Sequence, residues 1–319
     1  MGLKITGTGS AYPKLKITNN ELAAFLDTSD EWIRAKTGIQ TRAVLSDESL
    51  TDIAADAALK ALENAGMTAK DIDLVLCSTI CGDTHSPSQA FLIAERLGIN
   101  AAGYDINAAC NGFVYALDCA AGHFARGRYK KILIVAADHL SRFVDWSDRA
   151  TCVLFGDGAA AVVAEPGDDL LSLLITARPD GQTIRIPYVG GGSPFYKKEY
   201  EKQYLNMAGP EVYKFAVSAV APDIRSVLAQ AEIAEEDIDF VLLHQANKRI
   251  VDSAINTMSI DKAKYLTSVE STGNISGASV SALLDNGNRK GKFKKGALIV
   301  ISAFGAGLTT SACVLRWSK

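Results

Sequence analysis

Apolar positions follow two spacings along the chain, and together they predict a mixed α/β protein. Short runs of consecutive apolar residues are typical of strands buried on both faces. These runs lie at residues 4–9, 73–80 and 131–136. Apolar residues at helical spacing, or polar residues that favour a helix start, predict helices between the strands. The predicted helices begin at residues 19, 28, 51 and 86, and those at 51–65 and 86–97 are the longest.

The second half of the chain repeats the pattern of the first. Three pairs of segments match in the same order and at roughly the same offset: residues 67–76 with 233–242, 130–135 with 294–300, and 155–158 with 304–307. Agreement in both order and offset indicates an internal duplication. We therefore predict two α/β halves with mostly parallel sheets, residues 1–165 and residues 166–319. No flexible linker separates them, so they should pack as one body.

Composition removes several classes of protein. The 319 residues are 48% hydrophobic and carry a net charge of −3, which gives no bias toward nucleic acid or a membrane surface. No long uninterrupted apolar run predicts a transmembrane helix, and the N-terminus does not read as a signal peptide. Six cysteines with apolar neighbours predict reduced thiols in a cytoplasmic protein. Cys77 and Cys81 lack a second Cys/His pair, so no metal site is expected.

The first candidate for chemistry is Cys110, which lies where a strand-like run, residues 101–106, gives way to a helical pattern. A thiol at a helix start faces unpaired backbone N–H groups and the positive end of the helix dipole. Both favour the thiolate, so the position predicts a lowered pKa and a nucleophile. The alternative is an ordinary buried cysteine.

His244 and Asn274 are the second and third candidates. His244 follows the apolar run 240–243, and Asn274 lies in the turn-like segment 271–277. Taken singly, each reads better as a satisfied buried side chain or a turn residue. In the duplicated pattern, however, all three candidates lie at equivalent strand ends, which is where α/β proteins usually place their sites.

Together, Cys110, His244 and Asn274 resemble the Cys-His-Asn site of the thiolase superfamily, and the chain most closely resembles its β-ketoacyl-acyl-carrier-protein synthase III family. The resemblance covers essentially the whole chain and implies a five-layer α-β-α-β-α fold and a homodimer. The segments that carry it are residues 7–10, 28–33, 36–39, 105–112, 148–149, 155–159, 207–209, 244–250, 273–274 and 304–305.

The resemblance implies a reaction and a role for each residue. Cys110 would take the acyl group of acetyl-CoA or another short acyl-CoA, and malonyl-acyl carrier protein would then lose CO₂ and attack it. His244 and Asn274 would donate hydrogen bonds to the enolate oxygen. The backbone N–H groups of Cys110 and Ala306 would bind the oxyanion beside a wall formed by Phe304. Acyl-CoA is a substrate here, so no cofactor is implied.

The resemblance also implies two binding surfaces. Trp32 and Arg149 would hold the adenine of CoA between them, which suits an aromatic ring and a guanidinium. An acidic carrier protein would dock on a basic patch. The implied CoA contacts are Thr28, Trp32, Arg149, Gly209 and Asn247. The implied docking residues are Lys214, Lys248 and Arg249.

Three other interpretations compete with this one. A related condensing enzyme could start a polyketide or quinolone-type product from the same residues. A catalytically silent partner in a condensing heterodimer would typically lack the nucleophile, whereas Cys110 is present. A nucleotide-binding protein could use Phe155-Gly-Asp-Gly158 as a phosphate loop, but residues 150–163 predict a hairpin of strands rather than the start of a helix. The size of the acyl primer stays open.

Overall fold

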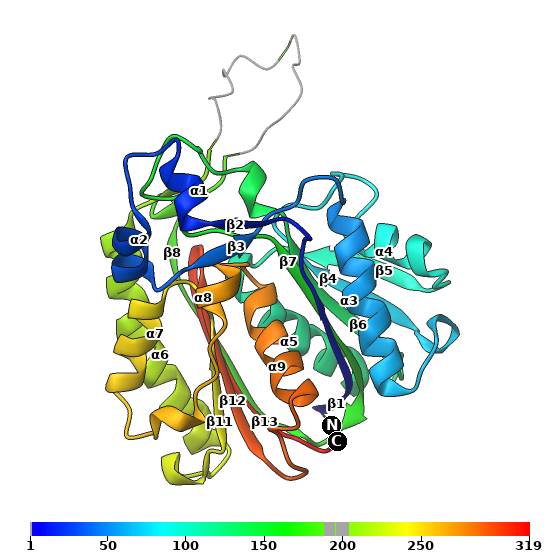
Figure 1. Cartoon of the computed structure of the whole chain (residues 1–319). Helices are drawn as coiled ribbons and strands as arrows, with labels where there is room; N and C mark the ends of the chain where they lie inside the picture. Colours follow the sequence, from blue (N-terminus) through cyan, green and yellow to red (C-terminus); the bar gives the residue numbers. More distant parts are fainter. Residues whose placement is uncertain (1, 188–194, 196–203) are drawn as a thin grey trace.

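A computed structural model of the chain describes residues 2–187, 195 and 204–319. Two sheets lie face to face with the helices α5 (Gly112–Ala125) and α9 (Ala278–Arg289) between them. Further helices cover the outer face of each sheet, so the molecule has five layers in the order α-β-α-β-α (Figure 1). This is the layered fold that the family resemblance implies.

The first sheet has five strands in the order β1-β7-β6-β4-β5. β6, β4 and β5 run parallel, while β7 is antiparallel to both β6 and β1. Helices α3 (Leu50–Ala65) and α4 (Gln89–Leu97) cover its outer face (Figure 1). The strands are β1 (Gly2–Ala11), β4 (Leu74–Ser78), β5 (Ala102–Ile106), β6 (Ile132–Asp138) and β7 (Gly158–Gly167).

The second sheet repeats this arrangement in the order β8-β13-β12-β11. Parallel β11 and β12 match β4 and β6, and a bridge from Val241 to Tyr265 lies where β5 lies in the first sheet. α6 (Gly209–Gln230) covers the outer face and packs on α7 (Lys248–Asn256). The predicted duplication is therefore confirmed in three dimensions, but the prediction of mostly parallel sheets is wrong, because the pairings of β1 with β7, β7 with β6, β12 with β13 and β13 with β8 are all antiparallel. The strands are β8 (Leu170–Asp180), β11 (Phe240–Leu243), β12 (Leu298–Gly305) and β13 (Gly307–Arg316).

A single apolar cluster joins the two halves through the middle layer. It contains Phe113 and Leu117 of α5, Leu283 of α9 and inward-facing residues of both sheets, such as Ile134 and Ile301. Burying each large side chain contributes about 1.5–3 kcal/mol. The halves therefore share a core, as expected for one body, while the exact division at residues 165/166 stays a prediction.

The predicted hairpin over residues 150–163 is wrong. Only β7, from Gly158, is a strand, and the residues before it form turns. The Asp157 carboxylate is fully buried and accepts hydrogen bonds from the N–H of Leu45 (2.8 Å) and from the Ser141 hydroxyl (2.6 Å). This segment therefore ties loops together, and Phe155 bridges to Asn274 of the other half. No phosphate loop is formed.

Short elements close one end of the molecule. The predicted helices near residues 19 and 28 are present: α1 is capped by Thr18, and α2 is capped by the Ser29 hydroxyl and ends at Gly38 in the left-handed region. No helix in the described ranges is long and apolar enough to cross a membrane. The short elements are α1 (Asn19–Ala23), α2 (Asp30–Thr37), α8 (Val269–Thr272), β2 (Lys16–Thr18), β3 (Thr41–Ala43), β9 (Ile184–Arg185) and β10 (Asn206–Met207).

Candidate active site

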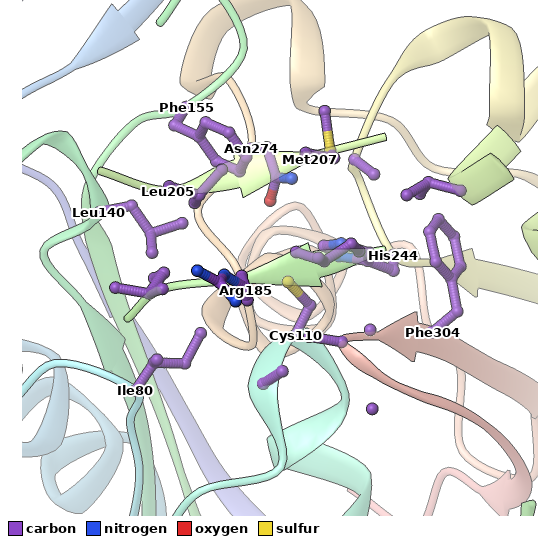
Figure 2. A pocket seen from close by; sticks show the side chains of 18 of the residues that line it. Ile80, Cys110, Leu140, Phe155, Arg185, Leu205, Met207, His244, Asn274 and Phe304 are labelled. Atoms are coloured by element: carbon purple, nitrogen blue, oxygen red, sulfur yellow. The ribbon is translucent and has the colours of Figure 1, made fainter. Parts of the chain in front are cut away.

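A pocket of about 310 Å³ opens beside the N-terminal ends of the two middle helices. Its wall brings together side chains that lie up to about two hundred residues apart in the chain, and Figure 2 shows the labelled ones facing a common space. The predicted active-site residues in this wall are Cys110, His244, Asn274, Phe304 and Ala306.

Cys110 lies in a single turn of 3₁₀ helix, Ala109–Asn111, immediately before α5. Its sulfur lies 3.5 Å from the Ser276 hydroxyl. The predicted lowering of its pKa is wrong for this structure. Burial raises the pKa of the Cys110 thiol to about 11, because desolvation of the thiolate outweighs the opposing effects of Ser276 and of the cysteine's own backbone N–H.

His244 is held by β11 and by Ser279 of α9. Its Nδ1 lies 2.7 Å from the Ser279 hydroxyl oxygen, which also accepts the N–H of Gln245 at 3.3 Å. The Ser279 proton is then free to donate to Nδ1, which leaves the Nε2–H of the ring as a donor. Burial lowers the pKa of His244 to about 3, so the ring is neutral. The ring packs edge-on against Phe304, with 5.1 Å between centroids.

Asn274 is oriented by the backbone that follows it. Its Oδ1 accepts the N–H of Ser276 at 2.9 Å. The side-chain NH₂ is therefore the end left to donate, and Asn274 lines the pocket (Figure 2). Two aimed N–H donors, on Asn274 and His244, thus lie in one buried pocket with a cysteine sulfur.

Gly305 brings strand β12 against the backbone of the nucleophile. A Cβ atom at this position would lie 2.9 Å from the backbone nitrogen of Cys110, so no side chain fits without movement. The close approach places the next residue, Ala306, at the pocket edge beside Cys110. Sequence analysis counted Gly305 among the residues that carry the family resemblance, but it did not predict this close approach to Cys110.

Thr28, Trp32 and Arg149 lie together at the molecular surface. The Arg149 guanidinium carbon is 5.3 Å from the Trp32 ring centroid, and Arg149 also pairs with Asp27 at 3.1 Å. To hold a flat ring between them, the Arg149 guanidinium and the Trp32 ring would have to lie roughly 7 Å apart, which is twice a van der Waals contact. Arg149 must therefore swing outward to admit one. The buried Thr28 hydroxyl has no hydrogen-bond partner among the described groups.

Gly209 and Asn247 lie beside the pocket rather than in its lining, which includes the nearby Met207 and Ala246 instead. Gly209 is the first residue of α6. Asn247 caps α7, because its Oδ1 accepts the N–H of Arg249 at 2.8 Å and its amide donates to the Lys36 carbonyl at 3.3 Å. Asn247 thus fixes the start of α7 against α2.

The three predicted docking cations lie on the adjacent helices α6 and α7, but they differ in their ion pairs. Lys248 lies 3.3 Å from Asp252 and 3.6 Å from Glu270. Lys214 and Arg249 are exposed and form no ion pair with any described residue. Of the three predicted docking cations, only Lys214 and Arg249 therefore carry a charge that no ion pair with a described residue neutralises.

The rest of the pocket is largely apolar, and sequence analysis did not identify its walls. Arg185, on β9, also reaches the lining. In the part of the chain that the structure describes, no group of His, Cys, Asp and Glu side chains could hold a metal ion. The apolar lining includes Ile80, Leu140, Phe155, Ile184, Ile186, Leu205, Met207 and Val212.

A neutral histidine, an oriented asparagine amide and a cysteine at the centre of an α-β-α-β-α fold define a condensing enzyme of the thiolase superfamily. A family model described as 3-oxoacyl-[acyl-carrier-protein (ACP)] synthase III matches residues 104–178, and the model of its C-terminal part matches residues 228–317. The chain belongs to this family, the β-ketoacyl-[acyl-carrier-protein] synthases III.

Individual relatives agree over the full length. The β-ketoacyl-[acyl-carrier-protein] synthase III of Geobacillus kaustophilus is 44% identical over 324 residues, covering 100% of both chains. The crystal structure of 3-oxoacyl-[acyl-carrier-protein] synthase III from Aquifex aeolicus matches with a TM-score of 0.91 at 37% identity, covering 99% of this chain and 100% of that one. The priming β-ketosynthase of the R1128 polyketide pathway matches with a TM-score of 0.93 at 32% identity, covering 100% and 97%.

Proposed function

We propose that this protein is a β-ketoacyl-acyl-carrier-protein synthase that joins a short acyl primer, delivered by CoA, to malonyl-acyl carrier protein and so starts fatty-acid synthesis. The observation that carries the proposal is the convergence of the Cys110 sulfur with the Asn274 amide and the neutral His244 ring in one buried pocket. Full-length relatives named β-ketoacyl-[acyl-carrier-protein] synthase III support it.

The first half-reaction is acyl transfer to Cys110. The sulfur attacks the thioester carbonyl carbon, CoA leaves, and the acyl group stays on the enzyme. The oxyanion formed on the way is bound by the backbone N–H groups of Cys110 and Ala306, which the close approach of Gly305 brings near each other. The acyl chain lies along apolar residues such as Ile80 and Leu140.

The second half-reaction is decarboxylation and condensation. Malonyl-carrier protein places its thioester oxygen against His244 and Asn274. Loss of CO₂ turns this oxygen into an enolate oxygen, and the two donors bind its growing charge more strongly than they bind the carbonyl. The enolate carbon then attacks the acyl carbon on Cys110, the sulfur leaves, and the β-keto product forms. The Phe304 wall keeps out water that would otherwise protonate the enolate.

The partners and the setting belong to the same proposal. CoA enters past Thr28, Trp32 and Arg149 and along Gly209 and Asn247. The carrier protein docks on Lys214 and Arg249, with Lys248 beside them. The enzyme works without a cofactor, in the cytoplasm, as a homodimer. The dimer contact that we favour is β5, the outer strand of the first sheet, where Tyr104 is 38% exposed.

Intact mass measurement tests the proposal. Incubation with single acyl-CoAs of increasing length should add one acyl group to the wild-type protein and none to Cys110→Ala. Later addition of malonyl-carrier protein should remove this group and yield a β-ketoacyl carrier protein. His244→Ala and Asn274→Ala should still take up the acyl group but lose decarboxylation by ~10²-fold or more. Loss of acylation with normal decarboxylation would reverse these roles.

A second function is favoured by one observation: a priming β-ketosynthase of a polyketide pathway has the same fold at 32% identity. The same site could prime a secondary product with another acyl group. The acyl-CoA panel separates the two, since a fatty-acid enzyme should prefer the short saturated primers.

A further inference from the structure

The backbone of Asn274 is held on both sides by a short segment of the first half, residues 153–156. The Asn274 N–H donates to the Leu154 carbonyl at 2.9 Å, and the Asn274 carbonyl accepts the N–H of Gly156 at 3.0 Å. Because the Asn274 amide is also oriented by the N–H of Ser276, these bonds decide where its NH₂ group points. The segment 153–156 therefore helps to place one of the two enolate donors.

A fully buried arginine packs against this pairing. Arg42 lies in β3, and a Cβ atom added at Gly156 would lie 3.3 Å from its Cβ. A Cβ atom at Gly273, directly before Asn274, would lie 3.2 Å from the same atom. The Arg42 Nη2 donates to the Val153 carbonyl at 3.1 Å. Arg42 thus contacts both segments that meet at Asn274, and the mechanism above does not use it.

The strand that carries Arg42 also joins the two halves. The Thr41 hydroxyl donates to the Ser271 carbonyl at 3.0 Å in the second half. The Ala43 carbonyl accepts the N–H of Asp157 at 2.8 Å in the first half. β3 lies against α8 (Figure 1), and Arg42 is the residue between these two contacts. It is therefore the central residue of a strand that holds the Asn274 turn to the loop before β7.

Asn19 holds the other side of the guanidinium. Its Oδ1 accepts a hydrogen bond from the Arg42 Nη2 at 2.7 Å, and its amide donates to Asp30 of α2 at 2.9 Å and to the Ile39 carbonyl at 2.8 Å. The Arg42 Nη1 donates to the Ile17 carbonyl at 3.3 Å. Arg42 is thus fixed between the first helices of the chain and the turn that carries Asn274.

Stability does not explain an arginine at this position. Its acceptors among the described residues are two backbone carbonyls and the Asn19 amide, none of them a carboxylate, and its Nε has no hydrogen-bond partner there. Burying a charge without a counterion is costly. Replacing buried charged groups by well-packed apolar ones is often neutral or stabilising. The geometry of the neighbouring turn is the better reason for Arg42.

We propose that Arg42 is a positioning residue for Asn274: it holds the segment 153–156 against residues 273–274 and so aims the Asn274 amide at the enolate oxygen. The inference rests on the proposed function. Among the described residues, no hydrogen bond joins Arg42 to Cys110 or His244. Loss of Arg42 should therefore slow decarboxylation of malonyl-carrier protein and spare acetyl transfer to Cys110.

The test compares the rate constants of the two half-reactions in Arg42→Met, which replaces the guanidinium by an apolar chain without a donor. Decarboxylation should fall by about ten- to a hundredfold, because a catalytic group displaced by about 1 Å can cost that much. Acetyl transfer should barely change. Arg42→Lys keeps the charge and one donor group, so its decarboxylation rate should lie between those of Arg42→Met and the wild type.

Asn19→Ala is the second variant, and it carries the test if Arg42→Met does not fold. It leaves Arg42 in place but removes the side chain that holds the guanidinium from behind. Decarboxylation should fall less than in Arg42→Met, and acetyl transfer should again barely change.

A double variant separates positioning of Asn274 from an independent effect. Arg42→Met combined with Asn274→Ala should decarboxylate no more slowly than Asn274→Ala alone, since an amide that is absent cannot be misplaced. Asp285→Asn is the matched control. Asp285 is also fully buried and accepts hydrogen bonds from Thr8 at 2.8 Å and Ser10 at 2.6 Å, away from residues 153–156 and 271–274. This control should leave the ratio of the two rate constants unchanged.

Several results would overturn the proposal. Equal losses in both half-reactions would make Arg42 a merely structural residue, and normal decarboxylation in Arg42→Met would remove its role altogether. Losses that multiply in the double variant would show that Arg42 acts apart from Asn274. The same change of ratio in Asp285→Asn would show a general effect of disturbing the core. A wild type that neither takes up acetyl groups nor decarboxylates malonyl-carrier protein would instead defeat the proposed function itself.

Discussion

Ser279 decides which ring nitrogen of His244 can donate into the pocket. Among the described residues, the hydrogen-bond partner of Nδ1 is the Ser279 hydroxyl, 2.7 Å away. If this hydroxyl is removed, Nδ1 loses its donor and the proton on the ring can move there, away from the enolate. Ser279→Ala should therefore lower decarboxylation of malonyl-carrier protein by about tenfold or more.

Acetyl transfer to Cys110 is the internal control for this variant, because the proposed acylation step does not use His244. Ser281→Ala serves as the matched control, since Ser281 is equally buried on α9 but donates to the Ala278 carbonyl. Equal losses in both half-reactions, or an equal loss in Ser281→Ala, would contradict the role of Ser279.

Burial of His244 also makes the protein sensitive to acid. The pKa of His244 is about 3 in the folded chain, against about 6.5 for an unfolded histidine. Below pH 6.5 the unfolded state therefore binds a proton that the folded state does not bind. The free energy of unfolding then falls by up to about 1.4 kcal/mol for each unit by which the pH is lowered. His244→Ala should lose less stability than the wild type between pH 7 and pH 4.

Asp138→Asn should act in the opposite direction. Asp138, at the end of β6, is fully buried, and burial raises its pKa to about 6. The folded state therefore takes up this proton before the unfolded state does, which favours folding as the pH falls from 6 to 4. Without this group, stability should fall more steeply. Urea unfolding at pH 7, 5.5 and 4 measures both effects, and parallel curves for the two variants would refute them.

At the scale of single residues, sequence reasoning found the side chains whose type carries the chemistry. Cys110, His244 and Asn274 could be predicted because together they resemble the Cys-His-Asn site of a known superfamily and lie at equivalent places in the duplicated pattern. Ser279 and Arg42 could not, since only the fold shows what a buried side chain faces. The predicted lowering of the Cys110 pKa failed because desolvation depends on side chains brought together by the whole fold.

Among the elements, β12 controls how closely the second half approaches the nucleophile. Gly305→Ala would place a methyl group 2.9 Å from the backbone nitrogen of Cys110. Either β12 or the turn Ala109–Asn111 must then move, which displaces the N–H groups aimed at the oxyanion. Acetyl transfer should fall by about ten- to a hundredfold. Gly181→Ala is the matched control, because Gly181 also lines the pocket but has open space around it. An unchanged rate of acetyl transfer in Gly305→Ala would show that the close contact of β12 with Cys110 is not needed for catalysis.

The helices α6 and α7 present the two unneutralised cations of the proposed docking surface. Arg249→Glu and Lys214→Glu should raise the apparent Michaelis constant for malonyl-carrier protein several-fold. The effect should shrink at high salt, because surface charges are screened over roughly 8–10 Å at ordinary ionic strength. Steady-state kinetics at two salt concentrations measure it.

Lys294→Glu is the control for this surface, since Lys294 precedes β12, whose other end reaches the pocket. Acetyl transfer from free acetyl-CoA should barely change in any of the three variants. If Lys294→Glu raised the apparent Michaelis constant for malonyl-carrier protein as much as Arg249→Glu does, or if the effect did not depend on salt, the carrier protein would have to dock elsewhere.

Most helices and strands could be predicted from the sequence, and the wrongly predicted hairpin before β7 has a clear structural cause. Strands β4, β6 and β11 and helix α3 appear where continuous apolar runs or helical spacing predict them. Residues 150–157 also form an apolar run, yet they are not a strand, because the backbone there hydrogen-bonds across the two halves, for example from Gly156 to the Asn274 carbonyl at 3.0 Å. An apolar run shows only that a segment is buried.

At the scale of the whole molecule, the first sheet ends in β5, which pairs with a described strand on one side only. Tyr104 on β5 and Phe91 on the neighbouring α4 are 38% and 47% exposed. An apolar edge strand is a ready surface for a second copy. Tyr104→Glu with Phe91→Glu should convert the proposed dimer to a monomer, as measured by sedimentation equilibrium. Leu59→Glu, an exposed apolar residue on α3, is the control and should stay dimeric.

Local patterns could predict the arrangement of the whole only as far as repetition in the sequence reveals it, and the five layers were implied by the family resemblance instead. The matching segments indicate two similar halves, and both sheets repeat the same strand order. Their shared middle layer follows from no local pattern. α5 is apolar and α9 buries many small residues, so both fit between two sheets, but the choice of neighbour depends on shape across the complete core.

The bridge between Phe155 and Asn274 also has a consequence for the order of events during synthesis. Cys110 leaves the ribosome well before Asn274, by roughly ten to thirty seconds at ordinary rates of elongation. Until the second half arrives, the thiol has neither Ser276 beside it nor the strand that carries Gly305. The nucleophile is thus synthesised early, but its active site is complete only after the second half has folded against the first. A nascent chain should carry no acyl group, and recovery of activity on refolding reports the docking of the two halves rather than the folding of either one.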